Sequence, residues 1–319
     1  MSSSMTQPEV QTSVTKDMKP TLSIILVCWN NNAYLDPCLK SLYDSRMKNS
    51  FDIVVVDNGS ADGSQQMLAE KYPEVKVIQN AENVGLGKAS NQGIEATNGS
   101  YVLLLNNDTI VNGPSFDTMI EFLDQHPKTG AVGGKLLNPD GTIQACYNYF
   151  STLKEEFFVA TRLGELIRRG YPAIMKSEEI TSVEWLGSAC LMLRRSALDK
   201  VGLLDEEYFI YGDEADLQYR LKKAGWDVYY LPHATTIHFG GRSMDRWRRR
   251  KMVYRGKMIF YEKNYGPLYT LLLRIMLGVL SMVKLTVWGI AYIFPSKREQ
   301  ADKELRSNLE VVQLCVSLT

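Results

Sequence analysis

The sequence predicts an α/β protein with an open parallel β-sheet and a C-terminal helical extension directed to a membrane. Three observations lead to this prediction. Apolar runs alternate with segments of helical periodicity between residues 22 and 105, a pattern typical of βαβ units. Asp57 and Asp108 each follow a predicted strand, at the sheet edge where such folds bind ligands. Beyond residue 266, a long apolar stretch follows a basic one.

The first half of the chain provides the predicted strands of this sheet. Residues 22–28 are continuously apolar, which predicts a strand buried on both faces. Residues 34–43 show helical spacing, and Pro37 is compatible with a helix only in its first turn. The remaining elements are expected in this order: a strand over 51–56 that ends at Asp57, a helix over 64–71, a strand over 75–79, a helix over 88–97 and a strand over 101–105.

The second half is less regular. Residues 138–141, Asn-Pro-Asp-Gly, predict a turn between two strands. Residues 150–182 are polar and irregular, and we expect a loop there that faces a substrate. The other expected elements are a strand over 183–193, a helix over 214–224 and a strand over 227–231.

Composition divides the chain into four segments: a polar leader over 1–19, a globular domain over 20–242, a basic and then apolar helical segment over 243–294, and a charged tail over 295–319. The 36 basic and 36 acidic residues balance, so no overall field attracts nucleic acid. The five cysteines form no CxxC pair, which favours a reducing compartment and argues against structural zinc. The leader lacks the apolar core of a signal peptide, so we expect the globular domain on the cytoplasmic side.

Four ionisable residues indicate chemistry. Asp213 and Glu214 open a predicted helix, where carboxylates also simply complement the helix dipole. Asp108 alone is equally suited to a turn, and a histidine such as His238, after a β-branched run, is more often structural. Together, a carboxylate, an imidazole and a spare acid pair suit a divalent cation and a general base.

Short motifs follow one another along residues 21–242. In the first half they are Asp57-Asn58-Gly59-Ser60, Asn83-x-Gly85, Asn91-Gln92-Gly93-Ile94 and Leu105-Asn106-Asn107-Asp108. In the second half they are Trp185-Leu186-Gly187-Ser188, Gly202-Leu203-Leu204-Asp205, Tyr211-Gly212-Asp213-Glu214 and His238-Phe239-Gly240-Gly241. This series resembles the inverting family-two nucleotide-sugar glycosyltransferases, in particular their rhamnosyltransferase-like branch. Each motif alone is weak, but their common order is a strong signal.

The resemblance implies a GT-A-type, Rossmann-like fold and a nucleoside-diphosphate sugar of the uridine or thymidine type as donor. Asp108 matches the last aspartate of the family's DxD metal motif, whose first aspartate is Asn106 here. The metal, Mg²⁺ or Mn²⁺, would rest on Asp108, His238 and the diphosphate. Donor contacts are implied for Trp29, Asp57, Asn83, Gly85, Asn91, Asn106 and Asn107.

These donor residues also have structural interpretations. Asp57 can accept a hydrogen bond from N3–H of uracil or thymine, or it can cap the following turn. Trp29 can stack on the base or pack in the core. Asn83, Gly85 and Asn91 are equally suited to a turn and a helix cap.

The resemblance places Glu214 at the family's catalytic base, although the order of the two acids is swapped here. We therefore favour Glu214 over Asp213 as the base of an inverting displacement. Asp216 is expected to pair with Arg220, one turn later. On the acceptor side the resemblance implies Trp185, Gly187 and Ser188, for which core packing is the alternative.

The expected function is transfer of a sugar, with L-rhamnose as the first candidate, to a lipid-linked or polysaccharide acceptor in bacterial envelope synthesis. Galactofuranosyl and N-acetylhexosaminyl donors are alternatives within this class. A protein that binds nucleotide sugar without catalysis, or nucleic acid through residues 246–251, is the alternative from another class. The intact acid pair and His238 favour catalysis, and the apolar stretch after the basic run favours a membrane surface over nucleic acid.

The apolar stretch, residues 267–294, is long enough to span a bilayer, which takes about 20 residues. Arg274 and Lys284 interrupt it, and with Gly278 and Ser281 they form one less apolar stripe. We therefore predict a helix that lies in the interface, on the cytoplasmic face of the plasma membrane, rather than one that crosses the bilayer. The basic residues before it are expected to face anionic lipid.

Overall fold

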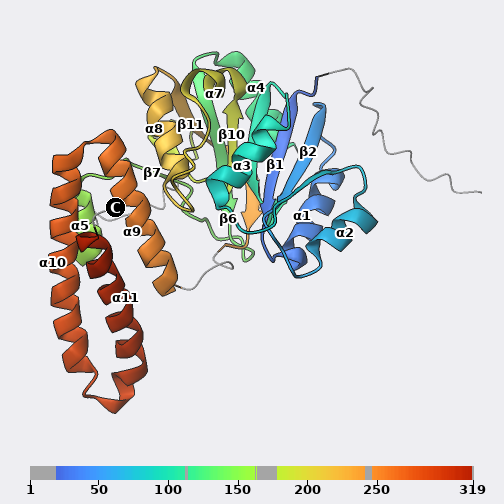
Figure 1. The fold of residues 1–319 in the computed structure, drawn as a ribbon. Coiled ribbons are helices and arrows are strands. Elements are labelled where there is room, and N and C mark those ends of the chain that lie inside the picture. Colours follow the sequence, from blue (N-terminus) through green and yellow to red (C-terminus); the bar gives the residue numbers. More distant parts are fainter. Residues whose placement is uncertain (1–18, 112–113, 162, 164–177, 241–245, 318–319) are drawn as a thin grey trace, which may run out of the picture.

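The structure is a computed structural model that describes residues 19–111, 114–161, 163, 178–240 and 246–317. In this part of the chain, a mixed β-sheet forms the centre of the fold, helices pack against it, and a helical bundle projects from one side (Figure 1). The predicted leader lies outside the described residues, apart from Lys19.

The strands follow the order β3-β2-β1-β4-β10-β6-β11-β5, and β8 pairs with β11. Their bounds are β1 Leu22–Cys28, β2 Phe51–Asp57, β3 Lys76–Gln79, β4 Tyr101–Asn106, β5 Thr109–Val111, β6 Thr129–Leu137, β8 Thr181–Ser182, β10 Cys190–Arg194 and β11 Asp227–His238. A separate two-stranded sheet pairs β7 Tyr147–Asn148 with β9 Trp185–Leu186.

The prediction of a parallel sheet is right for the first half and only partly right for the second, where β6 and β11 are parallel. β3, β2, β1 and β4 are parallel, and most apolar residues of β1, β2 and β4 are buried, as expected for strands covered on both faces. β10 instead runs antiparallel to both β4 and β6, and β5 runs antiparallel to β11. An apolar run has the same composition in either direction, so its pattern carries no information on strand polarity.

The helices of this domain are α1 Asn32–Asp44, α2 Ser64–Lys71, α3 Leu86–Glu95, α4 Ser115–Gln125, α7 Arg195–Val201 and α8 Asp213–Lys223. α3 packs on β1 and β2, and α4 packs on β6 and β11. The expectation for Pro37 is wrong, because α1 begins at Asn32 and encloses this proline beyond its first turn. Buried Leu35, Cys38, Leu39 and Leu42 keep one apolar face across it.

Three segments differ from the sequence-based expectation. The polar stretch after residue 150 is partly helical, since α5 spans Leu153–Thr161 and packs on the C-terminal bundle. The single strand expected over 183–193 is divided into β9 and β10 by a turn at residues 187–189. β11 continues past residue 231 as far as His238. This extension brings His238 to the edge of the main sheet.

The C-terminal bundle consists of α9 Arg246–Asn264, α10 Pro267–Ala291 and α11 Arg298–Val316, with a short 3-10 turn at Pro295–Lys297. The predicted charged tail is therefore helical. α10 and α11 form a hairpin, and α9 packs on both of them (Figure 1). A second apolar core, which includes Tyr208, Phe260 and Leu273, joins the bundle to the loop that precedes α8.

Candidate active site

Asp108 and His238 meet at one corner of the main sheet. Thr109 at the start of β5 pairs with His238 at the end of β11, and the backbone N–H of Phe239 donates to the carbonyl of Asp108 at 2.9 Å. This pairing leaves Asp108 Oδ1 3.3 Å from His238 Nε2, and Asn106 Nδ2 3.2 Å from the same nitrogen. Strand register thus brings together the two residues predicted to bind the metal, Asp108 and His238, and Asn106, predicted to contact the donor.

The chemistry of this corner fits a divalent cation. A carboxylate oxygen and an imidazole nitrogen at this separation can both reach one metal ion, and Asp108 is buried. No group of three or more His, Cys, Asp or Glu residues surrounds a common point among the residues described. The corner therefore offers two protein ligands, and the rest of a coordination shell falls to substrate and water, as is usual for Mg²⁺.

Asp57 and Trp29 lie together at the carboxyl ends of β2 and β1. Cys28 and Asp57 are register partners, so Trp29 follows directly beside Asp57. Asp57 is fully buried; its Oδ2 accepts a hydrogen bond from Gln65 Nε2 at 2.5 Å, whereas its Oδ1 has no partner within the described structure. Trp29 is 45% exposed, so it does not pack in the core. A buried, unpaired acceptor is costly unless a ligand supplies the donor.

Asn91 and Asn107 use their amides within the protein. Asn91 exchanges two hydrogen bonds with the backbone of Leu204, at 2.8 and 3.1 Å. Asn107 donates to the Val27 carbonyl at 2.9 Å and accepts from Asn31 Nδ2 at 2.5 Å. Their side chains therefore connect α3 to the loop before α8 and β4 to β1, so both have a structural role, and their contact with a donor stays a prediction.

Asn83 and Gly85 shape the loop that leads into α3. The side-chain oxygen of Asn83 accepts from Asn58 Nδ2 at 2.9 Å and from the Gly85 N–H at 3.0 Å. Gly85 has a φ of +93°, and a Cβ there would lie 2.8 Å from the carbonyl oxygen of Phe209. Only glycine allows this approach, which holds the loop before α8 against the start of α3.

Asp213 and Glu214 occupy the first turn of α8. Asp213 is buried, and its Oδ1 has no hydrogen-bond partner among the described residues, whereas Glu214 is partly exposed and its Oε2 accepts the N–H of Gly212 at 3.2 Å. Burial, and then the charge of Glu214 beside it, raise the pKa of Asp213 well above its usual range. Asp213 therefore keeps its proton more readily than an exposed carboxyl does.

A small cavity links the metal corner to the acid pair. Its volume is about 20 Å³, and Asn106, Ser188 and Asp213 contribute to its wall. Gln218 of α8 holds the turn that carries Ser188 in place, because its amide exchanges hydrogen bonds with the backbone of Leu186 at 2.8 and 2.9 Å. Ser188, expected on the acceptor side, therefore shares a cavity wall with Asp213, the neighbour of the expected base in the sequence.

Three of the residues over 185–188 do not pack in the core, whereas Leu186 between them is buried in it. Trp185 is partly exposed, and its Nε1 donates to the Tyr149 carbonyl at 3.0 Å. Gly187 and Ser188 are also partly exposed, and the N–H of Gly187 donates to the Cys146 carbonyl at 2.9 Å. The turn is thus fixed by hydrogen bonds and remains accessible to an acceptor.

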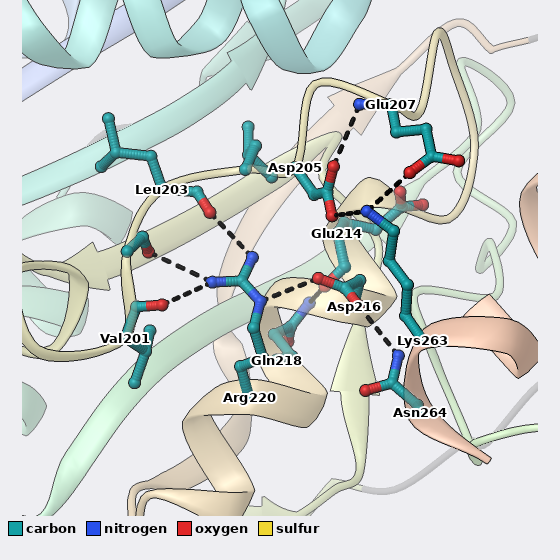
Figure 2. A network of polar contacts seen from close by, with 12 residues as sticks. Val201, Leu203, Asp205, Glu207, Glu214, Asp216, Gln218, Arg220, Lys263 and Asn264 are labelled. Atoms are coloured by element: carbon teal, nitrogen blue, oxygen red, sulfur yellow. Dashed lines mark hydrogen bonds and ion pairs between the residues drawn. The ribbon is translucent and has the colours of Figure 1, made fainter. Parts of the chain in front are cut away.

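A polar network fixes the far side of the acid pair (Figure 2). Asp216 pairs with Arg220 at 2.8 Å, as expected, and also accepts from Asn264 Nδ2 at 2.9 Å. Lys263 pairs with Asp205 and, at 2.8 Å, with Glu207. The last turn of α9 is therefore attached to the loop that positions Asp213 and Glu214.

Gly256 lets α9 approach this loop. A Cβ at Gly256 would lie 2.1 Å from the carbonyl oxygen of Tyr211, which is far inside contact distance. The helix and the loop are consequently packed backbone to backbone, next to the residue that begins α8. The C-terminal bundle is part of the support of the site and not a separate appendage.

Sequence reasoning missed several residues that shape the site. Gln65, Gln144 and Gln218 contact Asp57, His238 and the 185–188 turn through side-chain amides. Glutamine carries no pattern of its own, and each of these residues meets its partner only through the tertiary fold. The predicted turn over 138–141 was the one feature of the sequence that could have indicated a fixed position for Gln144, which follows it.

Comparison with known proteins settles the family. Residues 23–202 match the pattern that defines the family Glycosyl transferase family 2. The chain belongs to this family. It is 29% identical over 244 residues to the N-acetylglucosaminyl-diphospho-decaprenol L-rhamnosyltransferase of Mycobacterium tuberculosis, which covers 72% of this chain and 79% of that protein. The resemblance to rhamnosyltransferase-like members seen in the sequence is thereby confirmed.

Solved structures confirm the fold of this glycosyltransferase. The mannosyltransferase PcManGT of Pyrobaculum calidifontis, solved with GDP-Man and Mn²⁺, superposes with a TM-score of 0.54 at 13% identity, over 94% of this chain and 88% of that one. GalNAc-T7, solved with UDP, GalNAc and Mn²⁺, gives a TM-score of 0.53 at 17% identity, over 79% and 52%. The chain has the GT-A-like fold that was expected.

Proposed function

We propose that this family-two enzyme transfers a sugar, with inversion and with the help of a divalent cation, from a nucleoside diphosphate to a lipid-linked or polysaccharide acceptor of the cell envelope. The observation that carries the proposal is a single arrangement of residues. Asn106, which lies beside the Asp108–His238 corner, and Asp213, which precedes Glu214, line one small cavity near the carboxyl ends of the strands.

Asp57 and Trp29 are assigned to the base of the donor. The unpaired Oδ1 of Asp57 suits the N3–H of uracil or thymine, which cytosine lacks, and the exposed indole of Trp29 suits stacking on the same ring. The two structural neighbours carry different nucleotides, so the uridine or thymidine preference is supported by Asp57 rather than by them.

Asp108 and His238 are assigned to the cation, with Asn106 beside them. A bound Mg²⁺ or Mn²⁺ would neutralise the charge that develops on the departing diphosphate. Both structural neighbours were solved with Mn²⁺. Because Asn106 brings no charge, the pair alone should bind the ion weakly and depend on the phosphates of the donor for tight binding.

Glu214 is assigned as the general base. It would take the proton from the acceptor hydroxyl as that oxygen attacks the anomeric carbon, while the bond to the diphosphate breaks on the opposite face. A single displacement of this kind inverts the anomeric centre. Burial and the charge of Glu214 raise the pKa of Asp213, which favours its protonated form, and that form would donate a hydrogen bond to Glu214 and keep the basic carboxylate in place. Trp185, Gly187 and Ser188 lie on the side from which the acceptor would approach.

L-rhamnose is the proposed sugar, and a polyprenyl-linked glycan is the proposed acceptor. The mycobacterial relative supports both assignments by its name. A large apolar face on α10 supports an acceptor that resides in a membrane, because Leu272, Ile275, Val279 and Val283 are each more than 40% exposed. We accordingly assign the enzyme to the cytoplasmic surface of the plasma membrane.

The basic run in α9 is a poor candidate for nucleic-acid binding. Arg250 pairs with Glu304 at 2.8 Å, and Lys251 lies 3.8 Å from Glu310. Arg249 lies over the ring of Tyr211. These contacts use the cations to join α9 to α11 and to the active-site loop. These contacts also leave fewer basic side chains of α9 free to bind anionic lipid than the sequence suggested.

A donor panel tests the proposal. The purified enzyme is incubated with Mn²⁺ and with dTDP-rhamnose, UDP-galactofuranose, UDP-N-acetylglucosamine or GDP-mannose, each with and without a polyprenyl-diphosphate-linked N-acetylglucosamine acceptor. We expect nucleoside diphosphate release that is fastest with dTDP-rhamnose and depends on the acceptor. Absence of release from every donor would favour a binding protein, and the GDP donor as best substrate would refute the role given to Asp57.

A further inference from the structure

Gln144, in the hairpin that follows β6, holds both the ring and the backbone of His238. Its Oε1 lies 2.9 Å from His238 Nδ1, and its Nε2 lies 2.5 Å from the carbonyl oxygen of His238. A carbonyl oxygen only accepts hydrogen bonds, so the amide nitrogen must face it. The amide oxygen of Gln144 then faces the imidazole ring.

The same orientation follows independently from the turn over 138–142. Asp140 is a carboxylate that only accepts, and Thr142 Oγ1 donates to it at 2.6 Å. With its proton used in this way, Thr142 Oγ1 accepts from Asn138 Nδ2 at 2.8 Å. Asn138 Oδ1 therefore faces outward and accepts from Gln144 Nε2 at 2.7 Å. Each hydrogen bond fixes the direction of the next one.

This chain of hydrogen bonds determines which nitrogen of His238 carries the proton. Gln144 Oε1 can only accept, so Nδ1 must be the N–H that donates to it. Nε2 is then the unprotonated nitrogen, and it faces Asp108 Oδ1 at 3.3 Å. The amide nitrogen of Asn106, 3.2 Å from Nε2, donates to the same lone pair. The ring contacts of Gln144 and Asn106 thus agree on one tautomer. The carboxylate of Asp108 only accepts hydrogen bonds, so it fits this tautomer when a cation lies between its Oδ1 and Nε2.

We infer that Gln144 is a positioning residue: it fixes the tautomer and the ring orientation of His238, so that Nε2 presents its lone pair toward Asp108 and a divalent cation. The inference rests on the proposed function for the role of the cation, but not for the tautomer. A histidine that binds a metal through Nε2 usually donates its Nδ1–H to such a partner. Without that partner the ring can turn, and its proton can occupy either nitrogen.

The tautomer can be measured in the metal-free protein. The chain has three histidines, so [¹⁵N]histidine labelling gives few nitrogen signals, which His238→Ala assigns. Proteins to compare are the wild type, Gln144→Met, which keeps length but cannot bond the ring, and Gln144→Glu, which still accepts from Nδ1–H. Gln125→Met is the matched control, because Gln125 lies on α4 and bonds only Glu121 among the described residues. Mn²⁺ affinity is measured in parallel by electron paramagnetic resonance, with a nucleoside diphosphate present.

We expect the Nδ1–H tautomer in the wild type, in Gln144→Glu and in the control. Gln144→Met should give a mixture of tautomers and bind Mn²⁺ about 10- to 100-fold more weakly, whereas Gln144→Glu should lose less than about tenfold. A wild-type His238 protonated on Nε2 would overturn the inference. So would a folded Gln144→Met protein with unchanged tautomer and unchanged affinity.

Two further outcomes are decisive. If Gln144→Met does not fold, the tautomers of the wild type and of Gln144→Glu still decide the question. If the wild type has the Nδ1–H tautomer and yet no Mn²⁺ binds, the positioning role of Gln144 stands and the proposed metal dependence fails. The inference and the proposed function can therefore fail separately.

Discussion

Replacing each acid of the pair by its amide separates the two roles assigned to them. Glu214→Gln keeps the size of the side chain, and its amide oxygen can still accept the N–H of Gly212. It removes the basicity of the side chain, so no group remains to take the proton from the hydroxyl of the sugar acceptor. General bases contribute about 10²- to 10⁴-fold, so turnover should fall at least about 100-fold, equivalent to about 2.7 kcal/mol in the barrier.

Asp213→Asn should be much milder. Burial and the neighbouring Glu214 raise the pKa of Asp213, which favours a neutral carboxyl that can donate to Glu214. An asparagine amide is also neutral and also donates. The change therefore alters the quality of one hydrogen bond, about 0.5–1.5 kcal/mol, and turnover should fall by about two- to tenfold.

The assay is turnover with donor and acceptor at saturation, beside the dissociation constant of the nucleoside diphosphate. Nucleotide affinity should stay constant in both variants, because Asp57 and the Asp108–His238 corner are unchanged. An inactive Asp213→Asn enzyme together with an active Glu214→Gln enzyme would reverse the assignment. A parallel loss of nucleotide affinity would mean that the acid pair belongs to the donor site.

Three further changes test other parts of the structure. We expect sugar transfer to fall more than about 100-fold, with an unchanged circular dichroism spectrum, on chelation of divalent cations, in Asp108→Ala and in His238→Ala. Full activity in the presence of a chelator would show that the mechanism needs no metal. Gly256→Ala places a Cβ 2.1 Å from a backbone oxygen, so it should lower the free energy of unfolding by about 1–3 kcal/mol and remove much of the activity. Gly289→Ala is the control: its Cβ would have nothing within 4 Å, and the change should raise the free energy of unfolding by about 0.5–1 kcal/mol. Equal melting temperatures for the two variants would contradict the packing of α9. Because the pKa of Asp213 is raised in the folded state, the stability that this group contributes is complete below about pH 4 and is lost as the pH rises through the folded pKa. The melting temperature of Asp213→Asn should therefore exceed that of the wild type by an amount that grows with pH. A difference independent of pH would show that Asp213 is ionised in the fold.

The strands of the first half were predictable because burial on both faces leaves a direct mark on the sequence. Residues 22–28 and 51–56 are apolar throughout, and β1 and β2 fall within one residue of the predicted limits. The positions of Asp57 and Asp108 followed from the same strands. The metal corner depends on β11 being longer than predicted. Its last part was missed because residues 232–238 contain Pro232 and polar side chains, which do not show the pattern of a strand.

α5 shows why other elements were not predictable. Its buried side chains include Glu156, whose charge is compensated at 2.6 Å by Lys257 of α9. A carboxylate on the inner face interrupts the apolar pattern by which a helix is recognised, and the compensating lysine is about 100 residues away in the sequence. Gln144 is hidden in the same way. Such partners become visible only when the fold brings them together.

The sequence predicts that residues 267–294 lie in the membrane interface rather than cross the bilayer, and the neighbouring helix supports this prediction. The less apolar stripe of α10 faces α11: Arg274 donates to the Ser317 carbonyl at 3.1 Å, and Gly278 lies beside Cys315. The opposite face is left apolar and exposed. α11 itself carries exposed charges on its outer side: Glu299, Asp302, Lys303 and Arg306.

Because α10 and α11 pack along each other (Figure 1), α10 cannot cross the bilayer without taking these charges into it or separating from α11. Each charge near the bilayer centre costs about 3 kcal/mol, so four cost on the order of 10 kcal/mol. In the interface they stay in water while the apolar face enters the lipid. The enzyme should therefore leave membranes in alkaline carbonate, and Val279→Glu with Val283→Glu should abolish binding to anionic liposomes, whereas Leu309→Glu on α11, at a similarly exposed residue, should not. Retention in carbonate, or liposome binding by the doubly substituted protein, would show that α10 spans the bilayer or that another surface makes the contact.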